Sequence, residues 1–138
     1  MSIKDELFKI RNEQREIQEL KERIDTEYAS LLPSGIRYDI DKVQTSPTDR
    51  MTQTMADIDE HMGMLKAKLS ELMKRKLWAE GVIDTLGDAR QRQALSLYFL
   101  TPGRLSMDEV AERMGYSHGA AYGFYADGLA MLEKNVQN

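Results

Sequence analysis

The sequence predicts an all-α protein in which a long helical hairpin, or coiled coil, precedes a C-terminal helix-turn-helix unit. Apolar residues recur at spacings of three and four over residues 3–31 and again over residues 51–86. This is the heptad pattern of helices that pack against one another. Residues 105–132 (LSMDEVAERMGYSHGAAYGFYADGLAML) instead have the pattern of two short helices joined by a tight turn.

The first helix is expected over residues 3–32, a polar stretch without glycine or proline. Its spacing is regular only if Gln14 and Lys21 occupy two positions of the apolar stripe. These polar side chains could fix the register or the partner, or could lie at the edge of the contact, and both interpretations are open. The apolar members of the stripe are Ile3, Leu7, Ile10, Ile17, Ile24, Tyr28 and Leu31.

A linker is expected over residues 33–46, because Pro33 and Gly35 end the first helix. Ser46 followed by Pro47 then has the pattern of a helix start. The second long helix is expected to end or bend near Gly81 or Gly87. Its methionines are expected to pack in the core rather than line a ligand groove. Its stripe consists of Met51, Met55, Ile58, Met62, Leu65, Leu69 and Leu72, continued by Ala79, Ile83 and Leu86.

Residues 1–86 are therefore assigned to the hairpin with its linker, and residues 87–138 to the C-terminal domain. Whether the two long helices pair within one chain or between two chains is left open by the heptads. In the C-terminal domain, Asp88 is the expected N-cap of a helix that carries Ala94, Leu95, Tyr98 and Phe99 and ends before Pro102.

The following two helices have clear local signals. Ser106 and Glu109 have the spacing of a capping box. Gly115 can adopt the positive φ that ends a helix sharply, and Ser117 is the expected N-cap of the next helix. Tyr116 is the expected apolar plug of the turn. The remaining expectations concern burial: Val110, Ala111, Met114, Ala121, Phe124 and Leu129 toward the core, and Tyr122 and Tyr125 toward solvent.

The composition of the sequence excludes several classes of protein. The net charge is −4, there is no cysteine, and no apolar run could span a membrane or serve as a signal peptide. A soluble, cytoplasmic protein without cofactor or metal is expected. An enzyme is not expected, because His61 and His118 are the only histidines and belong to different units.

The C-terminal residues resemble the fourth region of sigma-70-type transcription factors, in the positions Leu86, Asp88, Arg92, Leu95 and Tyr98 and in the stretches LSMDEVAERMGYS and AMLEK. From about residue 41 onward, the chain resembles small phage and prophage regulators of the RinA and ArpU kind. Their joining segment is similar to DKVQTSPTDRM at residues 41–51. This resemblance implies promoter binding and control of phage transcription, with bacterial RNA polymerase as a candidate partner.

Under this hypothesis the protein binds double-stranded promoter DNA, and copies associate as a homo-oligomer through the coiled coil. Arg104, Ser106 and Ser117 would position the phosphates, with Arg90 or Arg92 nearby. His118 and Tyr122 would read base edges. The predicted DNA-binding residues are Arg104, Ser106, Ser117, His118, Gly119, Ala120, Tyr122 and Gly123.

Other hypotheses remain, because the expected recognition helix has no arginine or lysine at its exposed positions. Residues 84–138 contain five basic and seven acidic side chains, a net charge of −2. The unit could be a plain αα-corner. The chain could be an adaptor that binds RNA polymerase or another regulator with little or no DNA binding, or a small packaging subunit that forms a ring.

Overall fold

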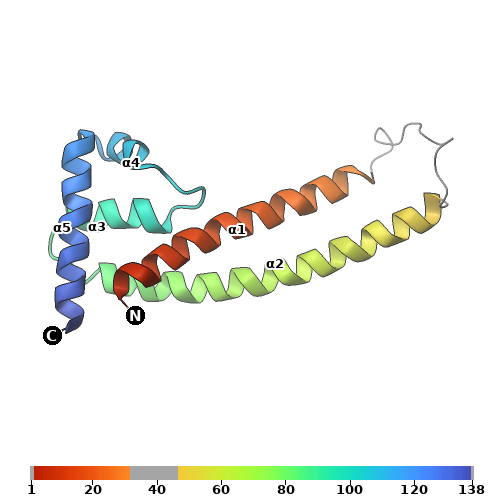
Figure 1. The fold of residues 1–138 in the computed structure, drawn as a ribbon, viewed down its shortest axis with the longest axis horizontal. Coiled ribbons are helices and arrows are strands. Elements are labelled where there is room, and N and C mark those ends of the chain that lie inside the picture. Colours follow the sequence, from red (N-terminus) through yellow and green to blue (C-terminus); the bar gives the residue numbers. More distant parts are fainter. Residues whose placement is uncertain (1, 32–46, 138) are drawn as a thin grey trace. The chain divides into compact units, whose positions relative to one another are not determined.

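Helices are the only regular secondary structure in the described part of the chain. The computed structural model describes residues 2–31 and 47–137, and no strand is present among them, which confirms the predicted all-α class. The linker predicted at residues 33–46, including the Ser46 cap, lies outside the described residues. The elements are α1 (Ile3–Ala29), α2 (Pro47–Ile83), α3 (Ala89–Leu95), the π-helical segment η3 (Ser96–Leu100), α4 (Met107–Met114) and α5 (His118–Gln137) (Figure 1).

The contacts divide the chain into two compact units. One comprises Met1–Glu16 and Glu71–Asn138, and the other comprises Ile17–Ser70. We call these the terminal unit and the hairpin unit. Helices α1 and α2 each contribute residues to both. The first residues of the chain therefore belong to the same unit as α3, α4 and α5, whereas the sequence pattern suggested a boundary at residue 86.

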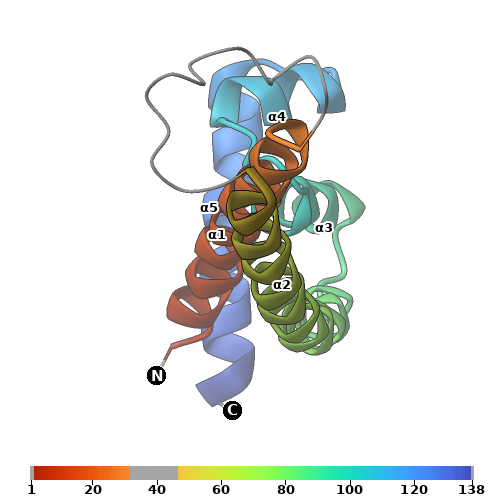
Figure 2. The ribbon, with the colours of Figure 1, turned by 90° about the vertical axis from the view of Figure 1, so that its right-hand side faces the viewer.

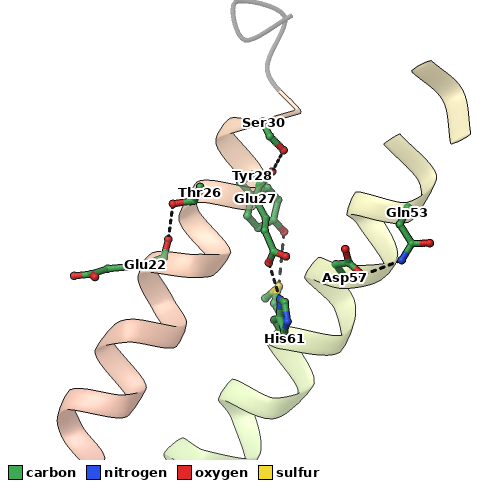
Figure 3. Close-up of polar contacts among 9 residues, drawn as sticks. Glu22, Thr26, Glu27, Tyr28, Ser30, Gln53, Asp57 and His61 are labelled. Carbon is green, nitrogen blue, oxygen red and sulfur yellow. Dashed lines mark hydrogen bonds and ion pairs between the residues drawn. The ribbon is translucent and has the colours of Figure 1, made fainter. Parts of the chain in front are cut away.

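In the hairpin unit, α1 and α2 run antiparallel and side by side (Figures 1 and 2). Ile17, Leu20, Ile24 and Ile58 are buried there. Polar contacts join the two helices near the C-terminal end of α1. His61 Nδ1 lies 2.7 Å from Glu27 Oε1, and the Tyr28 hydroxyl donates to Met62 Sδ at 3.7 Å (Figure 3).

The expected burial of the methionines in α2 is wrong for the single chain. Met51, Met55, Met62 and Met64 are all exposed, by between 37% and 55%. The reason is geometric, since α1 is a single neighbour and covers only the side of α2 around Ile58.

The first stripe needs a similar correction. Tyr28 is half exposed and Lys21 is exposed, while Leu20 is buried. Gln14, by contrast, is buried within the stripe, so of the two polar positions only Gln14 belongs to the contact.

The terminal unit is built around α5, against which both α3 and α4 pack (Figure 1). Gly128 allows α3 to approach α5 closely, because a Cβ at this position would lie 3.0 Å from Leu95 Cδ1. The largest fully buried side chains of this unit are Leu7, Ile10, Ile83, Leu86, Leu95, Phe99, Val110 and Leu132.

The N-terminal part of α1 is joined to the rest of the terminal unit by buried polar side chains. Arg11 Nη1 donates to the Tyr98 carbonyl at 2.5 Å, and Arg11 Nη2 donates to the Leu105 carbonyl at 2.9 Å. Gln14 Nε2 donates to the Phe99 carbonyl at 2.7 Å. Carbonyls in the last turn of a helix have no intrahelical donor, so these side chains supply the missing hydrogen bonds.

Aromatic rings surround this polar contact. The Arg11 guanidinium lies 3.8 Å from the centre of the Tyr98 ring, in cation–π geometry. Phe8 of α1 packs edge-to-face against Phe99, with the ring centres 5.1 Å apart, and Tyr98 packs in the same way on Tyr125. Burial lowers the pKa of Arg11.

The first turn of α1 has a partner on α5. The backbone N–H of Lys4 donates to Glu133 Oε1 at 2.9 Å, and the Ser2 hydroxyl accepts the N–H of Asp5. A carboxylate at a helix N-terminus satisfies free amides and interacts favourably with the helix dipole. Ser2 and Glu133 thus hold the first turn of α1 within the terminal unit.

We expect Gln14→Leu to destabilise the protein by about 1–3 kcal/mol, because the buried Phe99 carbonyl would lose its donor. Urea unfolding followed by circular dichroism measures this change. Gln18→Leu is the matched control, since Gln18 is exposed and the same substitution should change the free energy of unfolding by less than about 0.5 kcal/mol. Equal effects of the two substitutions would contradict this role of Gln14.

Candidate nucleic-acid interface

The candidate interface begins at the N-terminus of α4. The Ser106 hydroxyl accepts the Glu109 N–H at 3.2 Å, and the Glu109 carboxylate accepts the Ser106 N–H at 3.1 Å. The predicted capping box is therefore confirmed. The pKa of Glu109 is lowered, chiefly by the hydrogen bond from the Ser106 backbone and then by the Ser106 hydroxyl.

The turn between α4 and α5 also follows the local sequence signals. Gly115 has φ 77° and is the C-cap of α4. Tyr116 N–H donates to the Ala111 carbonyl, as in a Schellman-type ending. The Ser117 hydroxyl accepts the Ala120 N–H at 3.2 Å, which confirms Ser117 as a cap of α5. Asp88 likewise caps α3 by accepting the Arg90 N–H.

Helix α5 has one buried and one exposed side. Ala121, Tyr125, Leu129 and Leu132 are buried against the unit. Ser117, His118, Gly119 and Tyr122 are exposed at its start, while Ala120 and Gly123 are half-buried. The structure therefore brings six of the eight predicted site residues together on the first turns of this helix.

Three aromatic predictions are corrected by this arrangement. Tyr125 is buried rather than exposed, because its ring packs on Tyr98 and Phe99. Burial raises the pKa of Tyr125 to about 12. Phe124 is only half-buried, between Tyr116 and the Arg90 guanidinium. Tyr116 remains 42% exposed, so it covers Phe124 but is not an internal plug.

His118 has a partner that the sequence did not indicate. Its Nδ1 lies 2.5 Å from Asp108 Oδ1 on α4, and the two side chains are 58% and 81% exposed. Because an ionised carboxylate only accepts, Nδ1 is the donor in this pair, and none of the described residues hydrogen-bonds Nε2. Asp108 also adds a negative charge beside the start of α5.

Arg104 lies in the segment before α4 together with Ser106. Its backbone has φ 53°, the left-handed region that non-glycine residues rarely adopt. Its Nε is buried without a hydrogen-bond partner among the described residues. The positive charge of Arg104 contributes to the lowered pKa of Arg11, after the larger effect of burial.

The other two candidate arginines are engaged within the protein. Arg90 bonds the Asp88 carboxylate, and this pairing raises the pKa of Arg90. Arg92 Nη1 donates to the Leu86 carbonyl at 2.5 Å. Both guanidinium groups therefore have partners within the protein. Arg104 remains as the basic residue among the predicted DNA-binding residues.

No family model, curated protein or solved structure matches the chain. Within residues 2–31 and 47–137, no group of histidine and carboxylate side chains is arranged to hold a metal ion. The helices formed by these same residues include none that is both long and apolar enough to cross a membrane.

We expect Glu109→Gln to reveal the charge contribution of the capping box, because glutamine can keep the hydrogen bond without the charge. The folded pKa of Glu109 lies below its ordinary value of 4.5, so the native state holds fewer protons at acidic pH. The stability that the ionised Glu109 carboxylate contributes is fully present above pH 4.5 and is lost as the pH falls through the lowered pKa.

Unfolding curves of both proteins from neutral to acidic pH measure this effect. The wild-type protein should be the more stable at neutral pH, and the difference should vanish in acid. A difference that stays constant over the whole pH series would contradict the assigned role of the carboxylate.

Proposed function

We propose that the chain is a phage or prophage transcriptional regulator that binds double-stranded promoter DNA, and not an enzyme. Helices α4 and α5 would act as a helix-turn-helix, with the start of α5 in the major groove. The observation that carries the proposal is the exposed first turns of α5, which follow a glycine-ended helix and are supported by a buried opposite side. The resemblance to small phage regulators with a sigma-like region supports it.

The roles of the candidate residues follow from their chemistry. Arg104 and the Ser106 and Ser117 hydroxyls would contact phosphates. His118 Nε2 and the Tyr122 hydroxyl would meet base edges, since both are exposed on the same side of α5. These contacts are few and weakly basic, so binding by one copy is expected to be weak, and because it includes phosphate contacts it is expected to be salt-sensitive.

Three small residues complete the predicted surface. Gly119 and Gly123 have no neighbouring atom within 4 Å of the place where a Cβ would lie. They would allow the α5 backbone to approach the groove closely. Ala120 would contact a thymine methyl group.

The long helices would serve as a coiled-coil element that holds copies of the protein together. A homo-oligomer would present several helix-turn-helix units to DNA at once, which compensates for weak binding by each unit. This role rests on the same heptad pattern that predicted the hairpin.

We expect His118→Ala and Tyr122→Ala each to weaken DNA binding about tenfold or more, because one base contact contributes about 1–3 kcal/mol. Duplexes enriched from a random-sequence DNA library at low salt provide the probe. Fluorescence anisotropy against the best duplex then measures affinity. Met131→Ala is the control, since Met131 is exposed on α5 away from its first turns.

The absence of any enriched duplex for the folded wild-type protein at low salt would contradict the proposed function. So would equal losses of affinity in Met131→Ala and Tyr122→Ala, because binding would then not involve the start of α5 specifically.

A second candidate function is an adaptor that binds RNA polymerase or another regulator. The observation that favours it is Asp108, whose exposed carboxylate pairs with His118 at the start of α5, the helix that also carries exposed Tyr122. Tyrosines are enriched at protein interfaces, and a carboxylate repels phosphates.

Asp108→Asn separates the two candidates. Under the DNA hypothesis, this substitution removes a repulsive charge and should raise affinity for duplex DNA. Under the adaptor hypothesis, it should weaken binding to purified bacterial RNA polymerase in the absence of DNA. Unchanged affinity for both probes would exclude the surface around Asp108 from either role.

A further inference from the structure

One side of α2 in the hairpin unit carries apolar and charged side chains that the described residues leave exposed, although Tyr28 donates to one of them, Met62. Met55, Asp59, Met62 and Lys66 lie at successive spacings of four, three and four, which places them on one face of the helix. All four are exposed, and neither Asp59 nor Lys66 pairs with another described residue. We call these four residues the α2 face.

The charges of the α2 face are arranged to complement themselves. Asp59 and Lys66 lie about 10 Å apart along the helix, on either side of Met62 and Gly63. A second α2 that ran antiparallel, with a two-fold axis between residues 62 and 63, would place each Asp59 opposite the other copy's Lys66. A parallel arrangement would instead place like charges opposite one another, which is destabilising.

A glycine beside the middle of the α2 face allows close approach. Gly63 is exposed, and no atom lies within 4 Å of the place where its Cβ would be. The two Met62 side chains would meet at the axis and lose contact with water, and methionine adapts readily to such contacts. The contact is isologous, so every favourable pair occurs twice.

We propose that the α2 face is the contact surface of an antiparallel homodimer, occupied by the same face of a second copy of this chain. This inference rests on the coiled-coil oligomer of the proposed function and names its contact surface. Because the dimer forms without DNA, its failure is distinguishable from a failure of DNA binding. It also explains why Met55 and Met62 are exposed in the single chain.

Charge exchange tests the proposal. Asp59→Lys and Lys66→Glu should each raise the dimer dissociation constant about tenfold or more, because each places like charges opposite one another at two sites. The double variant, which exchanges the two charges, should restore the dimer. Sedimentation equilibrium over a concentration series at low salt measures the dissociation constant.

Lys68→Glu is the matched control. Lys68 is exposed on the same helix. It lies two residues after Lys66, so it points away from the α2 face. This variant should dimerise like the wild-type protein. The proposal is overturned by a monomeric wild type, by single variants that dimerise normally, by failure of the double variant to recover, or by equal effects of Lys68→Glu and Lys66→Glu.

Cysteine cross-linking tests the direction of the helices, since the chain has no cysteine of its own. Gly63→Cys lies next to the axis and should form a disulfide-linked dimer under mild oxidation. Thr52→Cys should not, because the two copies of residue 52 would lie roughly 30 Å apart in the antiparallel dimer. Cross-linking at both positions would indicate a parallel pair and would overturn the proposal.

Discussion

The terminal unit depends on the hydrogen bonds that Arg11 and Gln14 donate to backbone carbonyls of a distant segment. Tyr98 and Phe99 lie in the last turn of η3, where helix geometry leaves carbonyls without amide donors. An unpaired buried carbonyl costs free energy comparable to a lost hydrogen bond. Two side chains from α1 satisfy both groups and also the Leu105 carbonyl, so the N-terminal helix is part of this unit's core.

This contact also determines how the candidate interface is held. The carbonyls of Tyr98 and Leu105 lie at the two ends of the segment that contains Arg104. One guanidinium bridges them, and Ser106 then starts α4 with its capping box. The position of α4 therefore depends on Arg11, almost a hundred residues earlier in the sequence. Because the Gly115 turn joins α4 to α5, the position of the start of α5 depends on Arg11 as well.

Features set by neighbouring residues could be predicted from the sequence. The Asp88 cap, the Ser106–Glu109 capping box and the Gly115 and Ser117 signals each involve residues within three or four positions. Their structures follow from local backbone chemistry.

Features set by distant residues could not be predicted in the same way. The heptads left open whether Gln14 belongs to the contact, and nothing local indicated that its partner is the Phe99 carbonyl. Phe124 and Tyr125 are adjacent aromatic residues, and only the position of Tyr98 decides which of them is buried. The exposure of the methionines in α2 depends on how many helices surround it, which a heptad pattern does not give.

We expect the beginning of the chain and α3–α5 to unfold as one cooperative unit. Native-state hydrogen exchange, followed residue by residue with NMR, measures this cooperativity. The slowest amides around Leu7 and Ile10 should open with the same free energy as those around Phe99 and Leu132. If the N-terminal segment opens at much lower free energy while the amides of α3 and α5 remain protected, the two parts are not one unit.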